Sequence, residues 1–187
     1  QGAALDATGQ RLHVHDFLSR GVTRLELASF LTGTSASVTS SFVSTITGEA
    51  LPADVVTGKR IYDNASDDGG PDGSNRMSAE GYISCATCHV DGGHDGRTWD
   101  FTGRGEGLRN TTDLRGRTGV GHGRVHWSAN FDEVQDFEGQ IRAFALGGGL
   151  MTASDFADTA APLGPPKAGR SADLDALAAY VTSLDTV

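Results

Sequence analysis

The sequence predicts a mainly α-helical domain with long irregular loops, preceded by a short antiparallel β segment. Residues 53–63, 130–146 and 171–184 place apolar side chains at helical spacing. Residues 1–50 instead contain short runs in which apolar and polar residues alternate in places, which is typical of strands. The composition changes near residue 51, so we expect one part over residues 1–50 and a second over residues 51–187.

The first part contains three strand-like runs, at residues 12–17, 22–27 and 41–46. The turn-forming residues 19–21 separate the first two runs. Three short strands cannot bury both faces of their sheet alone. The segment resembles the closing blade of a β-propeller, and the alternative is a small sheet lying on the next domain.

The helices of the second part have recognisable ends. Pro52 suits the first position of a helix over residues 53–63, and Ser171 suits the N-cap of the last helix. Three consecutive glycines stop the helix expected over residues 130–146. The glycine- and arginine-rich stretch 92–123 lacks periodicity, so we expect it to be irregular. The acidic residues of 63–75 do not have the spacing of a regular calcium loop, so calcium is a weak candidate there.

The charge balance excludes some partners. The chain of 187 residues has 15 basic and 24 acidic side chains and a formal net charge of -9. This charge repels phosphate backbones, so a basic protein surface is a better partner than nucleic acid. No apolar run approaches the roughly 18 residues of a membrane-spanning helix, so none is expected. The chain begins at Gln1 without a charged and apolar leader, which suggests a processed protein or a piece of a longer one.

Both cysteines lie in one motif, Cys85-Ala86-Thr87-Cys88-His89. The pattern C-x-x-C-H is the attachment site of c-type haem. Two thiols three residues apart on one helical turn suit the two vinyl groups of the porphyrin, and the following histidine then offers its imidazole to the iron. The sequence therefore predicts one covalently bound haem c, with Cys85 and Cys88 as its anchors and His89 as an iron ligand.

Two other interpretations of the motif are weaker. A redox-active dithiol would lie next to a βαβ pattern, which is not visible here. A zinc site would need further ligands, and His94, His122 and His126 are the available histidines.

Residues 51–187 resemble a class I c-type cytochrome domain. Such domains cross an N-terminal helix and a C-terminal helix, and Gly58, Tyr62, Leu177 and Tyr180 match the residues at that crossing. More narrowly, residues 83–100, 108–111 and 125–127 resemble the haem domains fused to bacterial β-propellers, which are distantly similar to the C-terminal haem domain of dihaem peroxidases and MauG-like proteins. This resemblance also accounts for the strands before residue 51 as the end of a propeller.

The second iron ligand has several candidates. Met151 lies between the last two expected helices, where the distal methionine of the resembled family lies, and it is our first choice. His126 and His122 are alternatives, and Met77 is a poor one. In the peroxidase-like domains the histidine at the His126 position contacts a haem propionate, and the resemblance implies this role here.

Arginines gather in the stretch 91–124, which contains six of them against five acidic residues. The forked guanidinium group suits the carboxylates of haem propionates. Arg109 is the best candidate, with Trp127 packed near the edge of the ring. Residues 130–187 have three basic and nine acidic side chains, which favours a partner with a basic docking surface.

These observations predict a one-electron transfer domain with His89 and Met151 as axial ligands. Its partner would be a redox protein with a basic docking surface or a fused propeller domain. Because haem of this type is attached outside the cytoplasmic membrane, we expect a periplasmic or exported bacterial protein. The alternative is a peroxidase-like or oxidase haem enzyme whose distal iron position is open, with His122, His126 or Glu106 as its acid–base group.

Overall fold

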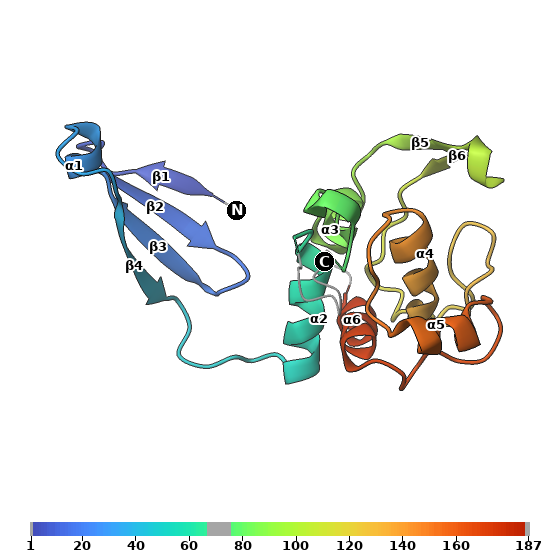
Figure 1. Ribbon diagram of the computed structural model, residues 1–187. Coiled ribbons are helices and arrows are strands. Elements are labelled where there is room, and N and C mark those ends of the chain that lie inside the picture. Colours follow the sequence, from blue (N-terminus) through green and yellow to red (C-terminus); the bar gives the residue numbers. More distant parts are fainter. Residues whose placement is uncertain (1, 67–75, 186–187) are drawn as a thin grey trace. The chain divides into compact units, whose positions relative to one another are not determined.

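The computed structural model describes residues 2–66 and 76–185. The chain forms two compact units, Gln1–Ala50 and Leu51–Val187, and the division falls where the composition changes (Figure 1). Most of the acidic stretch 63–75, weighed above as a calcium loop, lies outside the described residues.

The first unit is a four-stranded antiparallel sheet in the order β1-β2-β3-β4. Strands β2 and β3 pair along their full length, so that Leu12 lies opposite Leu25, and β4 pairs with β3 so that Val43 lies opposite Val22. The sheet comprises β1 (Ala3–Leu5), β2 (Arg11–Asp16), β3 (Gly21–Glu26) and β4 (Thr39–Ser44), with the one-turn helix α1 (Ala28–Leu31) before β4. Three of these strands match the runs expected from the sequence within two residues, and β1 was not expected.

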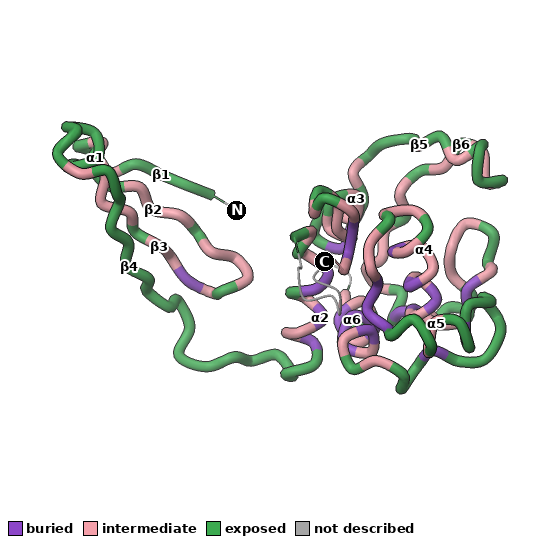
Figure 2. Tube along the Cα trace, viewed as in Figure 1, coloured by how far each residue is buried: buried purple, intermediate pink, exposed green. Residues whose placement is uncertain are grey.

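This sheet has no hydrophobic core of its own. Among residues 2–50 only Gly21 is buried, and every residue of β4 is exposed (Figure 2). Large apolar side chains such as Phe42 and Val43 are more than half exposed. A sheet of this size normally needs an apolar face covered by another layer. The structure therefore agrees with a segment that does not bury its own faces.

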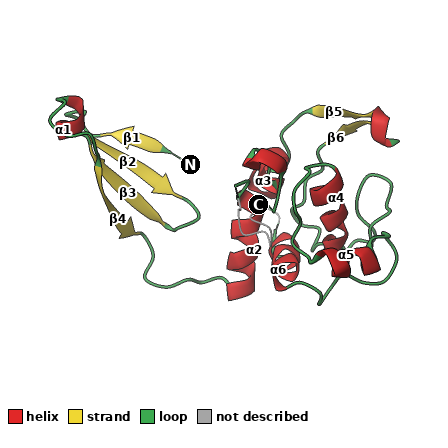
Figure 3. Cartoon of the chain, in the orientation of Figure 1, coloured by secondary structure: helices red, strands yellow, loops and turns green. Residues whose placement is uncertain are grey.

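The second unit combines short helices, single 3₁₀ turns and one hairpin (Figure 3). Its longest helices are α2 and α6, and strands β5 and β6 form a separate two-stranded antiparallel sheet. In chain order the elements are α2 (Ala53–Asp63), η1 (Ala79–Gly81), α3 (Cys85–Cys88), η2 (Val90–Gly92), β5 (Thr98–Phe101), η3 (Thr102–Arg104), β6 (Gly107–Asn110), η4 (Val134–Phe137), α4 (Glu138–Ala143), α5 (Ala153–Thr159) and α6 (Ala172–Thr182).

The prediction of a mainly α-helical fold is wrong. Of the described residues, 32% are helical and 18% lie in strands, and the strands form two small antiparallel sheets, so the fold mixes α and β elements. Two local errors contribute to the difference. The stretch 92–123 contains the hairpin β5–β6, and the helix expected over residues 130–146 is only the short pair η4–α4. The hairpin was missed because β5 has only four residues. The alternation of Trp99 and Phe101 is therefore too short a pattern to indicate a strand in a glycine-rich stretch.

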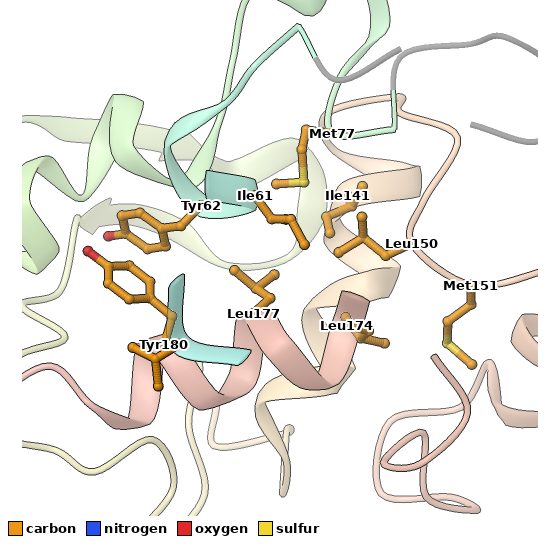
Figure 4. Close-up of a cluster of buried hydrophobic side chains, with 10 residues drawn as sticks. Ile61, Tyr62, Met77, Ile141, Leu150, Met151, Leu174, Leu177 and Tyr180 are labelled. Carbon is orange, nitrogen blue, oxygen red and sulfur yellow. The ribbon is translucent and has the colours of Figure 1, made fainter. Parts of the chain in front are cut away.

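The crossing of α2 and α6 was predicted correctly and organises the core. A Cβ atom on Gly58 would lie 1.8 Å from the carbonyl oxygen of Ala176, so only glycine allows this approach. One turn further, the rings of Tyr62 and Tyr180 meet edge to face at 5.0 Å. Figure 4 shows the aliphatic side chains of Ile61 and Leu177 beside this pair. The side chain of Ser171 caps α6 by accepting a hydrogen bond from the backbone of Leu174, as expected.

Candidate cofactor site

The C-x-x-C-H motif forms one turn of helix. Helix α3 begins after Ser84, whose backbone N–H donates to the side-chain oxygen of Thr87 in a capping box. The backbone N–H of His89 donates to the carbonyl oxygen of Cys85 at 2.9 Å, which continues the turn to the histidine. Both cysteines are free thiols. The two sulfurs and the imidazole therefore come from one rigid turn.

The environment of the thiols does not suit a redox-active dithiol. Burial raises the pKa of Cys85 to about 12, and burial also raises the pKa of Cys88. A reactive dithiol needs a thiolate stabilised by a lowered pKa. Nor does the described part of the chain contain a group of three or more His, Cys, Asp or Glu side chains that could hold a metal ion. The redox and zinc interpretations of the motif thus gain no support.

The hydrogen bonds of His89 define the tautomer of its ring. Its Nδ1 lies 2.9 Å from the carbonyl oxygen of Thr112 and 3.3 Å from that of Gly93. Carbonyl oxygens only accept, so Nδ1 carries the proton and Nε2 keeps its lone pair. Burial lowers the pKa of His89, which favours the neutral ring. The hydroxyl of Tyr62 donates to the backbone carbonyl of His89 at 2.7 Å and ties the motif to α2.

The motif opens into a cavity of about 500 Å³. Its walls come from helices α2, α3, α4 and α6, from the hairpin β5–β6 and from the loop between β6 and η4. Apolar and aromatic side chains make up much of the lining, among them Tyr62, Met77, Trp99, Phe101, Val125, Trp127, Phe137, Ile141, Phe144, Leu177 and Val181.

The residues of this cavity fit a haem. A cavity of this volume lies within the range of roughly 300–1,000 Å³ that is typical of cofactor sites. Two thiols and the imidazole of His89 lie together at its wall, apolar side chains can cover a porphyrin, and arginines can meet its carboxylates. Two thiols followed by one imidazole are the donors that a c-type haem would need.

Besides the motif itself, His126 and Trp127 are among the candidate residues from the sequence that line this cavity. His126 is largely buried, with 10% of its side chain exposed, and its ring stacks on Phe131 at 4.6 Å. Trp127 lines the cavity, contacts the ring of Phe101 at 4.9 Å and donates from its indole nitrogen to the carbonyl oxygen of Asn110. His122, the other histidine alternative, also lines the cavity but is exposed.

Met151, the first choice for the second iron ligand, does not line the cavity. It is 3% exposed and belongs to the apolar core, where Figure 4 shows it well apart from Tyr62 and Met77. Its backbone N–H donates to Glu138, and its carbonyl oxygen accepts from Arg142. Met77, the poor candidate, is the methionine that lines the cavity. The distance of each methionine from the motif along the sequence could not show which of them lines the cavity. The fold places the segment that precedes the motif, with Met77, in the cavity wall.

Arg109 also lies outside the cavity lining and pairs with Glu106 at 3.5 Å. The arginines of the lining are Arg104, Arg117 and Arg124, all of them exposed at the rim. Arg104 donates to the carbonyl oxygen of Ala143. The sequence showed that this stretch is rich in arginine. Within the unexpected hairpin β5–β6, Arg104 reaches the cavity and Arg109 does not, and the loop after the hairpin contributes Arg117 and Arg124.

Comparisons with protein-family models, with curated proteins and with solved structures find no match for this chain. Among the described residues, none of the helices has the length and apolar character needed to cross a membrane.

Proposed function

We propose that this chain carries one c-type haem, bound covalently through Cys85 and Cys88 and ligated by His89, and that it transfers single electrons. The observation that carries the proposal is the state of His89. Its Nδ1 is hydrogen-bonded to a backbone carbonyl, its Nε2 forms no hydrogen bond among the described residues, and it follows two free thiols on the same turn at the wall of a cavity. A ligating histidine typically donates its second N–H to such a partner.

The chain's own residues prepare the attachment. On attachment, the thiols of Cys85 and Cys88 would each add across one vinyl group, so that sulfur would bond to carbon and the thiol proton would go to the neighbouring vinyl carbon, with no oxidant consumed. The capping box of Ser84 and Thr87 holds both thiols on one turn while this happens. The carbonyl oxygen of Thr112 keeps the imidazole of His89 in the tautomer that presents Nε2.

The remaining walls set the environment. When bound, a haem supplies the reversible one-electron couple of its iron. Ile141, Leu177 and Val181 give the cavity an apolar wall, and Arg104, Arg117 and Arg124 offer positive charge at its rim. Such surroundings help to hold a redox group at a defined potential.

The excess of acidic over basic side chains in residues 130–187, nine against three, is not reduced by the buried ion pairs, because each pair uses one acidic and one basic residue of this stretch. Several of these carboxylates are used inside the unit. Asp136 pairs with Lys167 at 2.6 Å, and Glu138 pairs with Arg142 at 2.8 Å. Asp132, Asp158 and Asp185 remain exposed. We propose a redox partner protein with a basic docking surface, or a fused propeller domain, and a location outside the cytoplasmic membrane where such haem is attached.

Expression together with a c-type haem maturation system tests the attachment. We expect the protein to gain the mass of one haem and to keep it after denaturation, whereas the Cys85→Ala/Cys88→Ala variant gains none. A control variant, His94→Ala, alters a histidine outside the cavity lining and retains the haem. Wild-type protein that matures without haem would overturn the proposal. A spectroelectrochemical titration that fits a single one-electron transition tests the electron-transfer role.

The second candidate function is a peroxidase-like or oxidase site. It is favoured by one observation, since His126, Glu106 and Arg104 all line the cavity and the first two lie 3.9 Å apart. The imidazole and the carboxylate could act as an acid–base pair toward a substrate bound at an open iron position. A high-spin ferric spectrum and rapid cyanide binding by the wild-type protein would favour this function over electron transfer.

A further inference from the structure

We propose that His126 supplies the second axial ligand of the iron, through Nε2, and that Asn130 is the residue that orients it. This inference rests on the proposed haem and replaces Met151 as the second ligand. It gives the site two imidazole ligands instead of an imidazole and a thioether.

The tautomer of His126 matches that required of a ligand. Its Nδ1 lies 2.9 Å from the side-chain oxygen of Asn130, and the carboxylate of Glu106 lies 3.9 Å away. Both groups are acceptors, so they favour the proton on Nδ1 and leave the lone pair on Nε2. His89 has the same arrangement, with a carbonyl oxygen as the partner of Nδ1. Among the described residues, no hydrogen bond is formed by Nε2 of either ring.

The imidazole of His126 is held firmly in the cavity wall. A short backbone bridge between Val125 and Phe131 closes the loop that carries it, and the N–H of Ala129 donates to its carbonyl oxygen. The ring of Phe131 stacks on the imidazole with an interplanar angle of 14°, and the ring of Trp127 lies 4.8 Å away on another side. A ligand needs this kind of fixed orientation, because metal geometry tolerates little movement.

The backbone at His126 is also unusual. Its φ angle is 69°, in the left-handed region that side chains other than glycine rarely adopt. Strained residues of this kind cluster at ligand-binding and active sites. The same loop also contains Ala129 with a φ angle of 49°. The chain therefore accepts an unfavourable conformation at the position that directs this imidazole to the cavity.

The other candidates are less suitable. The Nε2 of His122 lies 3.2 Å from the carbonyl oxygen of Gly116, and the side chain is exposed. Met151 does not reach the cavity lining. Met77 does, but it is 2% exposed and packs in the apolar core with Ile61 and Ile141. His126 alone among these four lines the cavity with an anchored ring and a free nitrogen.

Glu106 completes the support of His126. Its two carboxylate oxygens both accept from the hydroxyl of Ser128 at 2.7 Å, and one approaches Arg109. Arg109, which was expected to bind a propionate, therefore pairs instead with Glu106, the carboxylate that lies beside the imidazole of His126. The groups that face this imidazole are the side chains of Asn130 and Glu106 and the rings of Trp127, Phe131 and Phe137.

The test uses the full chain with its haem attached. We expect the wild-type ferric protein to be low-spin, to lack the far-red absorption band of methionine-ligated haem, and to bind cyanide slowly. The His126→Gly variant should become high-spin and bind cyanide at least tenfold faster, and added imidazole should restore the low-spin spectrum. His126→Gln gives a second variant of similar size if the glycine variant does not fold. The matched controls, His122→Ala and Met151→Leu, should keep the wild-type spectrum.

Asn130 has its own signature. Asn130→Leu removes the acceptor of the Nδ1 proton and should give a mixture of high-spin and low-spin ferric protein, while Asn130→Asp keeps an acceptor and the low-spin spectrum. A methionine band in the wild type that survives in His126→Gly and disappears in Met77→Leu or Met151→Leu overturns the inference. A high-spin wild type overturns it as well. Wild-type protein without covalent haem is a different result, which overturns the proposed function itself.

Discussion

The imidazole of His89 donates from Nδ1 to the carbonyl oxygen of Thr112 at 2.9 Å, across 23 positions of the chain. This bond joins the one-turn helix of the C-x-x-C-H motif to the loop after β6. The next residue, Asp113, receives two hydrogen bonds from the side chain of Arg115 and one from its backbone. The turn that presents the Thr112 carbonyl is therefore held by an ion pair.

The ion pair makes stability depend on pH. The hydrogen bonds and charge of Arg115 lower the pKa of Asp113 below its ordinary value of 3.8. A carboxyl group whose pKa is lowered by folding stabilises the native state above its unfolded pKa, and this contribution is lost as the pH falls toward its folded pKa. In acid below about pH 4 we expect the free energy of unfolding of the wild type to fall more steeply than that of Asp113→Asn. Equal slopes in chemical denaturation across this range would contradict the prediction.

The approach of α2 and α6 requires Gly58. In Gly58→Ala the new methyl group would meet the backbone of Ala176, which cannot move aside without shifting α6, so we expect a loss of about 1–3 kcal/mol or more in the free energy of unfolding. Gly139→Ala is the matched control, since Gly139 lies in α4 and a Cβ atom there would meet nothing within 4 Å. This control should be neutral or stabilise by up to about 1 kcal/mol. Urea denaturation of both variants measures the difference.

The hydroxyl of Tyr62 ties α2 to the motif. Tyr62→Phe removes its hydrogen bond to the carbonyl oxygen of His89 and leaves the ring packing intact, so the expected cost is about 0.5–1.5 kcal/mol. Tyr82 is 69% exposed, and Tyr82→Phe should change the free energy of unfolding by less than about 0.5 kcal/mol. Thermal and urea unfolding compare the two variants, and equal effects would show that the Tyr62 hydroxyl contributes nothing.

Lys167 and Asp136 form an ion pair whose side chains are 1% and 2% exposed. Lys167→Met leaves a buried carboxylate without its cation, and we expect a loss of about 3–5 kcal/mol. Asn at position 136 keeps an oxygen for the N–H of Asp132 but carries no charge. The double variant Lys167→Met/Asp136→Asn should therefore recover part of the loss. A double variant less stable than Lys167→Met would argue against the charge as the cause.

The rim arginines should influence the potential of the proposed haem. Arg117 and Arg124 line the cavity, whereas Arg109 does not. Loss of a nearby positive charge favours the ferric state, so Arg117→Gln and Arg124→Gln should each lower the midpoint potential by on the order of tens of millivolts at low salt. Arg109→Gln should have a smaller effect. Potentiometric titration of the three variants in parallel distinguishes an arrangement with Arg117 and Arg124 near the haem from the one inferred from the sequence, in which Arg109 binds a propionate.

Much of the fold could be predicted where a local pattern was long or strict. Helix α2 was predicted with its bounds and α6 with its serine cap, because their apolar stripes span three turns. The approach of Gly58 to α6 was predicted from its resemblance to a known crossing. The hairpin β5–β6 and helix α5 were missed, since their strands and helix have only four and seven residues and depend on tertiary contacts more than on periodicity.

The sequence by itself determined the C-x-x-C-H motif, on which the proposed haem attachment rests, because the spacing of the cysteines and the following histidine are properties of five consecutive residues. Only the tertiary structure decided which distant residues share the cavity with them. It brought Met77, Arg117 and Arg124 to the lining and left Met151 and Arg109 outside it. The physical reason is that a residue lines a cavity only if its loop passes the cavity and its side chain points into it. Short irregular segments that contain left-handed residues such as His126 have no periodic sequence pattern from which either property could be predicted.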